Sequence, residues 1–335
     1  MKQSLFFCVA IFVFFSACSK KKYHINGVSF VASNTVVDAS HIAPVKKIHA
    51  NYVALMPFGF IRDLNSPLVE YSKKWQWFGE TKQGVAHDAA MFQKHGIKIM
   101  LKPQLWVSRG SFTGGIEMNS EEDWQLLEAS YEKFILDFAR VAQQNKISIF
   151  CIGTELEKFV AERSNYWRNL IGKIRKVYDG EITYAANWDE FKRVPFWDAL
   201  DFIGIDAYFP LTDQHTPTVE EFERGWQSHK QQILKVYHTH QIPVLFTEFG
   251  YRSIDYNGQK PWEYSRVEGG VNLQAQQNAT KAIFNQFWEE SWFAGGFLWK
   301  WFHNHHQVGG VHNNRFTPQN KPVEEDIRQF YKQLN

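Results

Sequence analysis

The sequence predicts an α/β fold, a single (β/α)8 barrel of the TIM type, and three observations lead to it. Eight near-continuously apolar runs recur along the 335 residues, as expected for parallel strands that are covered on both faces. Patterns typical of amphipathic helices lie between these runs. No linker rich in Pro, Gly or Ser divides the chain, so the strand–helix units belong to one domain.

The predicted strands cover residues 27–33, 51–58, 98–106, 147–156, 181–188, 200–209, 242–251 and 293–302. A doubly wound open sheet is the main alternative, and it usually carries a Gly-rich turn after its first strand. The residues that follow the first run, Asn34-Thr35-Val36-Val37, contain no glycine. We therefore expect a closed barrel rather than an open sheet.

Helices are predicted between the strands at 85–95, 120–144, 165–178, 219–240 and 272–290. The first of them ends before Gly96, and glycine suits the position that follows a helix. The second begins at Ser120, a good N-cap residue, and three acidic residues follow that favour the helix dipole. The connections after the first and fifth strands are shorter and less clearly helical.

The first 26 residues are predicted to lie outside the barrel domain, which covers residues 27–335. A short basic start and an apolar run over 5–15 are typical of a signal peptide and too short to span a membrane. Small residues before Cys18 resemble a bacterial lipoprotein box, which predicts a signal peptide over 1–17, lipidation of Cys18 and a tether over 18–26. A plain signal peptide with an incidental cysteine is the alternative. We expect a protein exported to the bacterial cell envelope and lipid-anchored there, in the outer membrane or at the cell surface.

The composition excludes some functions and favours others. A formal net charge of +2 gives no indication of nucleic-acid binding. Of the three cysteines only Cys151 lies beyond the leader, so neither an internal disulfide nor a cysteine zinc site is expected. The chain contains 13 Trp, 13 Tyr and 29 Phe. Part of this aromatic content must be core, but flat indole rings also suit stacking on the apolar faces of sugars.

Two glutamates, Glu155 and Glu248, end apolar runs that are predicted to be the fourth and seventh strands. Burying an unpaired carboxylate is costly, so such placement is unusual. The carboxyl ends of barrel strands carry the active site, and the period-2 rule allows both side chains to face the barrel axis. A salt-bridged structural pair is the alternative, but the two contexts together favour catalysis. Glu157 lies beyond the strand end and is interpreted as a loop residue or a carboxylate that supports the reacting pair from behind.

Other strand ends carry polar and aromatic side chains that we expect near the two glutamates. The predicted substrate-binding residues are Lys102, Trp106, Asn187, Trp188, Tyr208 and Trp299. Asp206 lies on the same strand face as Tyr208, and the sequence leaves open whether its role is structural or functional.

At these motifs the sequence resembles glycoside hydrolase family 113, which is known for β-1,4-mannanases. The resemblance covers essentially the whole chain after the leader and rests on residues 27–30, 102–106, 152–156, 205–208 and 247–251 and on Trp299-Lys300-Trp301. It implies that Glu155 is the general acid/base, Glu248 the nucleophile and Tyr208 a hydrogen-bond donor to Glu248. Trp299 would form the floor under the reacting sugar. Asn187 would contact the sugar 2-hydroxyl, because Thr154 stands where many members of the wider clan have asparagine.

The chemistry of retaining glycosidases needs two carboxyl groups about 5–5.5 Å apart, one attacking the anomeric carbon and one protonating the leaving oxygen. Their environments must differ so that one stays ionised and the other begins as an acid. Tyr208 and a cation, either Lys102 or Arg252, are candidates for setting that difference.

Histidines at 303, 305, 306 and 312 suggest a metal site, but they lack a helical i, i+4 spacing. We expect residues 304–315, with Gly309-Gly310, to form a loop that contacts the substrate instead. No metal and no cofactor is predicted.

The expected function is that of a retaining endo-β-1,4-mannanase acting on mannan, glucomannan or their oligosaccharides. We expect the protein to be a monomer and its partner to be a β-linked glycan. The same mechanism on another β-linked glycan, or exo-cleavage of oligosaccharides, is the alternative within enzymes. A non-catalytic glycan-binding lipoprotein is the alternative outside enzymes, and the presence of both glutamates argues against it. The exact glycan and the choice between endo and exo action are open at this stage.

Overall fold

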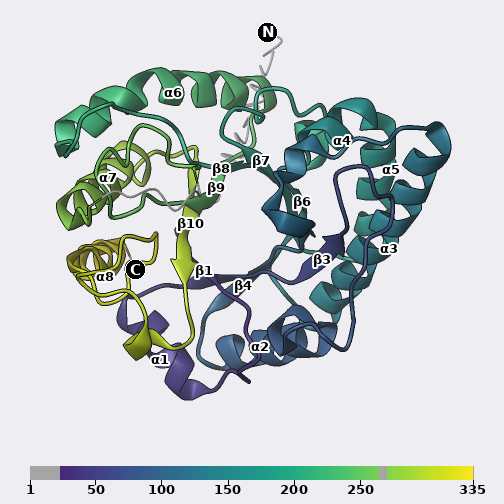
Figure 1. Ribbon diagram of the computed structural model, residues 1–335, viewed down its shortest axis with the longest axis horizontal. Coiled ribbons are helices and arrows are strands. Elements are labelled where there is room, and N and C mark those ends of the chain that lie inside the picture. Colours follow the sequence, from purple (N-terminus) through teal and green to yellow (C-terminus); the bar gives the residue numbers. More distant parts are fainter. Residues whose placement is uncertain (1–22, 264–269, 335) are drawn as a thin grey trace, which may run out of the picture.

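Eight parallel strands close into a barrel, and the helices form a ring around it (Figure 1). This computed structural model describes residues 23–263 and 270–334. Around the barrel the strands follow the order β1-β10-β9-β8-β7-β6-β4-β2. Their bounds are β1 Ile25–Phe30, β2 Tyr52–Leu55, β4 Lys98–Leu101, β6 Ile149–Thr154, β7 Glu181–Asn187, β8 Phe202–Asp206, β9 Val244–Phe249 and β10 Phe293–Trp301. The predicted (β/α)8 fold is confirmed.

Eight α-helices and five short 3₁₀ turns lie between and after the strands in the described part of the chain. The helices are α1 Ala39–Lys47, α2 Lys82–Lys94, α3 Glu121–Gln144, α4 Glu157–Glu162, α5 Ser164–Arg175, α6 Val219–His240, α7 Leu273–Phe287 and α8 Pro322–Leu334. The turns are η1 Phe78–Glu80, η2 Ser108–Gly110, η3 Thr113–Gly115, η4 Trp197–Ala199 and η5 His305–Gln307.

All five predicted helices are present, and three helices were not predicted. Helix α1 has only nine residues and contains Pro44, which obscures its pattern. Helix α8 carries a signal that could have been found, because its buried residues Val323, Ile327 and Tyr331 are four apart. As expected, the connection after the fifth barrel strand is hardly helical and holds only η4.

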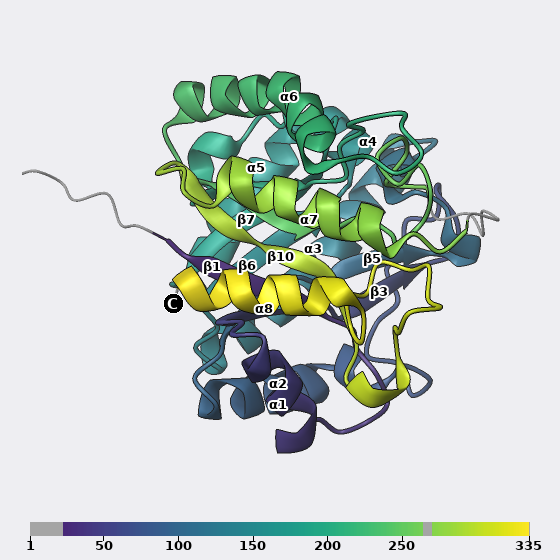
Figure 2. The same ribbon diagram turned by 90° about the vertical axis from the view of Figure 1, so that its left-hand side faces the viewer.

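Two of the predicted strands are each split by a proline. The run 51–58 becomes β2 and the start of β3 (Phe58–Ile61), and the run 98–106 becomes β4 and β5 (Gln104–Val107). Pro57 and Pro103 have no N–H to donate, so each interrupts its strand. Strands β3 and β5 pair with each other as a parallel two-stranded ribbon beyond the barrel (Figure 2).

Side chains fill the barrel interior on the side where its strands begin, so the barrel is not a pore. Residues of seven of the eight strands form this small buried cluster: Ile25, Tyr52, Ala54, Met100, Ile149, Phe202, Leu245, Ala294 and Phe297. Gly27 is required beside it, because a Cβ there would lie 2.5 Å from the Phe297 ring. A much larger core packs the helices against the outer face of the barrel. The polar strand ends are therefore left at the C-terminal mouth.

The N-terminal predictions fall mostly outside the described residues. The signal peptide over 1–17 and the lipidation site Cys18 lie there, as does most of the predicted tether. Strand β1 begins at Ile25, two residues before the predicted start of the barrel domain. None of the helices formed by residues 23–263 and 270–334 is long and apolar enough to cross a membrane.

Candidate active site

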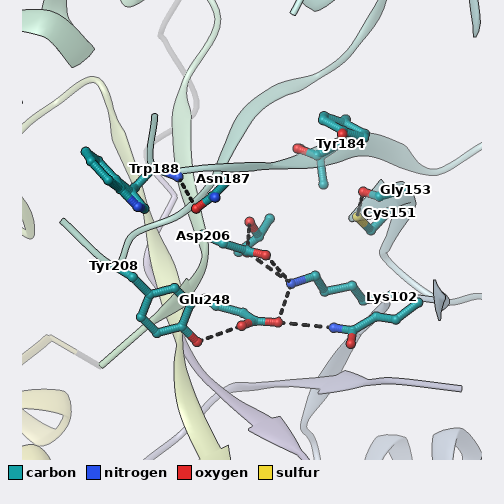
Figure 3. A network of polar contacts seen from close by, with 12 residues as sticks. Lys102, Cys151, Gly153, Tyr184, Asn187, Trp188, Asp206, Tyr208 and Glu248 are labelled. Carbon is teal, nitrogen blue, oxygen red and sulfur yellow. Dashed lines mark hydrogen bonds and ion pairs between the residues drawn. The ribbon is translucent and has the colours of Figure 1, made fainter. Parts of the chain in front are cut away.

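Glu248, near the C-terminal end of β9, is held by three hydrogen-bond donors (Figure 3). Its Oε1 accepts from Lys102 Nζ at 2.6 Å and from Gln104 Nε2 at 3.1 Å. Its Oε2 accepts from the hydroxyl of Tyr208 at 2.7 Å. Only 5% of Glu248 is exposed. Three donors on one buried carboxyl fix its direction.

Lys102 joins Glu248 to a second carboxylate, Asp206. Its Nζ lies 3.0 and 3.1 Å from the two Asp206 oxygens, and the Thr247 hydroxyl donates to Oδ1 of Asp206 at 2.7 Å. Burial alone lowers the pKa of the Lys102 ammonium, but the charges of Asp206 and Glu248 outweigh it and the net shift is upward. Burial, and then the charge of Glu248, raise the pKa of Asp206. One permanent cation therefore lies between two carboxylates.

Glu155 follows β6 directly and adopts a left-handed backbone, with φ of +50°. Non-glycine residues seldom adopt this conformation, and it persists only where neighbours impose it. The backbone N–H of Glu155 donates to Ala185 at 2.8 Å, and its carbonyl accepts from the Thr113 hydroxyl at 3.1 Å. The next N–H, of Leu156, donates to the Tyr184 hydroxyl at 2.6 Å. These contacts turn the chain at the barrel mouth and hold Glu155 in place.

The environment of Glu155 favours a protonated carboxyl. The residue is only partly exposed. Burial is the largest cause of a pKa well above the ordinary value, and the charges of Asp206 and Glu248 add to it, with Lys102 opposing. Glu248 has direct cationic and hydroxyl donors. The Lys102 ammonium makes its hydrogen bonds to Glu248 and Asp206, and at Glu155 its charge only opposes the rise in pKa. The two glutamates therefore have the contrasting environments that an acid and a nucleophile need.

The three predicted tryptophans come from the ends of three different strands. Trp299 is half-buried at the end of β10, with Lys300 Nζ 5.1 Å from its ring centre. Trp106, on β5, is 49% exposed. Trp188 stacks on Trp262, with ring centres 5.0 Å apart and planes 21° apart. Trp262 was not predicted, and it comes from the long connection after β9.

Two predicted substrate contacts have different neighbours from those expected. Lys102 is completely buried, and its ammonium contacts carboxylates, so the structure does not present it to a sugar. Of the two candidate cations, Lys102 reaches Glu248, whereas Arg252 Nε donates to the carbonyl of Asn314 at 3.2 Å. Asn187 Oδ1 accepts from the N–H of Trp188 at 2.8 Å, so its contact with a sugar hydroxyl stays a prediction.

Gln104 was not among the predicted site residues, and the sequence does not decide the role of Asp206. Gln104 belongs to the same strand face as Lys102, and this period-2 spacing was the available signal. Asp206 pairs with Glu248 in the ladder between β8 and β9, which places both at the same height in the barrel. That register is a property of the closed barrel and is not visible in the sequence.

The loop after β10 lines a cavity of about 390 Å³ beside this centre. The cavity is also bordered by Arg252, Lys300 and Phe316, and the Phe316 ring lies 5.8 Å from that of Tyr208. One histidine of this loop has another partner, since His305 Nε2 lies 2.6 Å from Glu324. Within residues 23–263 and 270–334, no group of three or more His, Cys, Asp or Glu side chains is arranged to hold a metal ion.

Solved structures similar to this chain include GH113 β-mannanases. A GH113 β-mannanase from Alicyclobacillus acidocaldarius, solved in complex with ManMIm, matches with a TM-score of 0.81 and 25% identity over 94% of this chain and 99% of its own. A complex of a GH113 β-1,4-mannanase matches with a TM-score of 0.80 and 22% identity over 93% and 99%. A β-glucuronidase from Faecalibacterium prausnitzii shares the fold at 14% identity, with a TM-score of 0.60 over 94% of this chain and 50% of its own. A search of curated proteins gave no match.

A closed parallel barrel with one glutamate after its fourth strand and another on its seventh, in contrasting environments, defines a glycoside hydrolase of the barrel type. The model of Glycoside Hydrolase Family 113 matches residues 32–321, which is most of the chain. The protein therefore belongs to glycoside hydrolase family 113, as its motifs suggested.

Proposed function

We propose that the protein is a retaining endo-β-1,4-mannanase that hydrolyses mannan, glucomannan or manno-oligosaccharides. The observation that carries the mechanism is the contrast between Glu248, held by three donors, and Glu155, whose pKa is raised. Family membership and the 25% identical neighbour named as a β-mannanase support the choice of mannan.

The reaction takes place in two displacements. In the first, the Glu248 carboxylate attacks the anomeric carbon while Glu155 gives its proton to the leaving glycosidic oxygen, which forms a covalent glycosyl-enzyme. In the second, Glu155 takes a proton from a water molecule, whose oxygen attacks the same carbon and releases Glu248. The product keeps the β configuration, and both glutamates return to their starting states.

The neighbours of Glu248 prepare it for attack. Lys102, Gln104 and Tyr208 fix both of its oxygens, so little reorganisation is needed as its charge is transferred to the new bond. We assign Trp299 to the floor under the reacting sugar and Asn187 to its 2-hydroxyl. Trp106 and Trp188 are assigned to neighbouring sugar units, on which indole rings can stack; Trp106 is 49% exposed and Trp188 is partly exposed.

The test compares the wild-type protein with Glu155→Gln and Glu248→Ala on a panel of β-linked glycans, with products separated by chromatography. Oligomannosides should appear from mannan with the wild type and with neither variant. Glu157→Gln is a matched control, since Glu157 lies two residues from Glu155 but pairs with Arg193, and it should retain activity. Activity that survives in Glu248→Ala and is removed by EDTA would contradict the mechanism.

Added azide separates the roles of the two glutamates. With a β-glycoside that has a good leaving group, azide can replace the missing nucleophile in Glu248→Ala, and the product should be the α-glycosyl azide. In Glu155→Ala, azide should instead attack the glycosyl-enzyme and give the β-azide. The reverse pattern would exchange the two assignments.

We further propose that the chain is exported and anchored to the cell envelope through a lipid on Cys18, and that it acts as a monomer. The lipoprotein-like residues before Cys18 support the anchor. Export would place the enzyme where its polymeric substrate is found. Wild type should fractionate with membranes and Cys18→Ala should not, and light scattering of the detergent-free Cys18→Ala protein should give the mass of one chain.

A further inference from the structure

The ribbon formed by β3 and β5 has one buried and one open face. Gly59 and Ile61 of β3, with Leu105 and Val107 of β5, are buried against the core. The alternate residues face the opposite way and stay partly or largely exposed: Phe58, Phe60, Gln104 and Trp106. Three aromatic side chains on an open face are unusual, because nothing in the fold requires them there.

The aromatic rings continue from the ribbon onto the next segment of the chain. The ring centre of Phe58 lies 6.3 Å from that of Trp106 and 6.3 Å from that of Phe60. Trp75 then packs edge-on against Phe60, with ring centres 4.7 Å apart, and remains 58% exposed. The four rings form one continuous apolar surface, which we call the ribbon platform.

The ribbon platform is held in place by hydrogen bonds. Phe60 and Glu70 exchange two backbone bonds of 2.8 Å, and Gln76 Nε2 donates to the Phe58 carbonyl at 2.9 Å. These bonds fix the segment that carries Trp75 beside β3. A preformed aromatic surface loses little entropy when a ligand covers it, which is what a binding site needs.

Gln104 connects the ribbon platform to Glu248. Gln104 contacts Glu248 Oε1 at 3.1 Å, and Trp106 is the next residue on the same face of the strand. Two residues along a strand span about 7 Å, so Trp106 lies outward from the reacting ring rather than over it. In Figure 2 the labels of β3 and β5 lie on one side of the barrel, where its strands end.

We propose that the ribbon platform binds further sugar units of the β-linked glycan chain whose bond is cleaved between Glu155 and Glu248. This rests on the proposed function and extends it from the reacting sugar to the distal part of the substrate. A polysaccharide emerging from the site must run over whatever surface adjoins it, and aromatic rings stack well on the apolar faces of its sugars. Continuity with Glu248 through Gln104 favours the glycan over a second copy of the chain as the occupant.

The test measures kcat/KM on a long manno-oligosaccharide and on an aryl glycoside of a single sugar. Trp75→Ala and Trp106→Ala should each lower the ratio of kcat/KM for the long substrate to kcat/KM for the short one about tenfold. This change equals about 1.4 kcal/mol. Trp75→Phe should recover most of the loss. Leu126→Ala on α3, which removes a 51% exposed apolar side chain elsewhere, should leave both values unchanged.

The outcomes separate this inference from the proposed function. If mannan is not cleaved but another β-glycan is, the same ratio is measured with that glycan. If no glycan is cleaved, the proposed function fails, and the ribbon platform is tested by fluorescence titration with the manno-oligosaccharide. A ratio or an affinity that is the same in wild type and Trp75→Ala, or the absence of binding, overturns the inference. A wild-type dimer that Trp75→Ala dissociates without changing the ratio would overturn it in favour of a contact between copies.

Discussion

The ammonium group of Lys102 lies 2.6 Å from Oε1 of Glu248, and both groups are buried at the barrel mouth. The same ammonium contacts Asp206, and Glu155 is close enough for its pKa to be raised by both carboxylates. Three carboxyl groups therefore share one cation. Protonation of one carboxyl relieves the excess negative charge, and Glu155 is suited to it because burial and both neighbouring charges raise its pKa. This arrangement of charge suits Glu155 to the acid role that we propose for it.

Replacing Lys102 with methionine should inactivate the enzyme and destabilise it. Glu248 and Asp206 would then repel each other without a cation, and Glu248 would lose one of the three donors that fix its direction. Breaking a buried pair from one side costs about 3–5 kcal/mol of unfolding free energy. The loss of a preorganised donor should lower kcat by roughly 100-fold to 1,000-fold. Denaturant unfolding and kinetics on the same preparation measure both effects.

A partly exposed ion pair provides the control for Lys102. Lys230 lies 2.6 Å from Glu290 on the outside of the barrel, and Lys230→Met should cost about 0–1 kcal/mol and leave kcat unchanged. The double variant Lys102→Met/Asp206→Asn removes one of the two stranded charges and should be more stable than Lys102→Met alone. A normal kcat in Lys102→Met would show that the cation does not prepare the nucleophile.

Tyr208→Phe should slow the reaction while leaving the fold intact. The variant removes the 2.7 Å hydrogen bond to Oε2 of Glu248, and such a bond to a charged group contributes about 1.5–3 kcal/mol. If that energy is lost from the transition state, kcat falls by roughly 10-fold to 150-fold. Tyr251→Phe is the matched control, since that buried hydroxyl donates to the Phe209 carbonyl at 2.8 Å. It should lower stability by about 1 kcal/mol with no change in kcat.

The pH profile should show that Asp206 influences the acid. Burial is the largest cause of the raised pKa of Glu155, and the charge of Asp206 is the next. Asp206→Asn removes that charge and leaves Lys102 to Glu248 alone, so ionisation of Glu155 becomes easier and its pKa falls. The general acid must be protonated, so activity is lost as pH rises through this pKa. The alkaline limb of kcat/KM should therefore move to lower pH in Asp206→Asn, and an unmoved limb would argue against the coupling.

The fold could be predicted because each strand and each long helix leaves a pattern in its own stretch of sequence. Each barrel strand is an apolar run, and each long helix has a clear pattern, so the (β/α)8 order follows from the chain alone. The ribbon of β3 and β5 could not be predicted in this way, because Pro57 and Pro103 interrupt runs that look continuous. Its existence depends on two prolines at equivalent positions in neighbouring strands.

The site was predictable only where a residue conflicts with its local context. Glu155 and Glu248 stand out because carboxyls rarely follow such apolar runs. Gln104 and Thr247 do not stand out in the sequence. Gln104 matters because it lies 3.1 Å from Glu248, and Thr247 because it lies 2.7 Å from Asp206, in each case a carboxylate on another strand. Such distances are set by the stagger of strands in the closed barrel. Lys102 was predicted to contact sugar because its sequence context does not show that it is buried. Its burial follows only from closure of the barrel.

Glu190 should make the protein less stable as pH rises, and Glu190→Gln should reduce this effect. Its carboxyl accepts from the Tyr184 hydroxyl at 2.7 Å and from the Asn187 N–H at 3.0 Å, and burial raises its pKa to about 8. The unfolded chain releases this proton near pH 4.3, while the folded protein keeps it until about pH 8. The folded state binds more protons throughout this window, so its stability falls with pH, by about 1.4 kcal/mol for each unit of pKa difference.

Denaturant unfolding at pH 5 and pH 8 measures the contribution of Glu190. The wild type should lose stability between these values, and Glu190→Gln should lose less, because glutamine has no proton to release. Glu122→Gln, an exposed change on α3, should follow the wild type. Equal losses in Glu190→Gln and the wild type would mean that Glu190 is already ionised at neutral pH. Its two donors, together with Arg193 nearby, would then stabilise the carboxylate more than burial disfavours it.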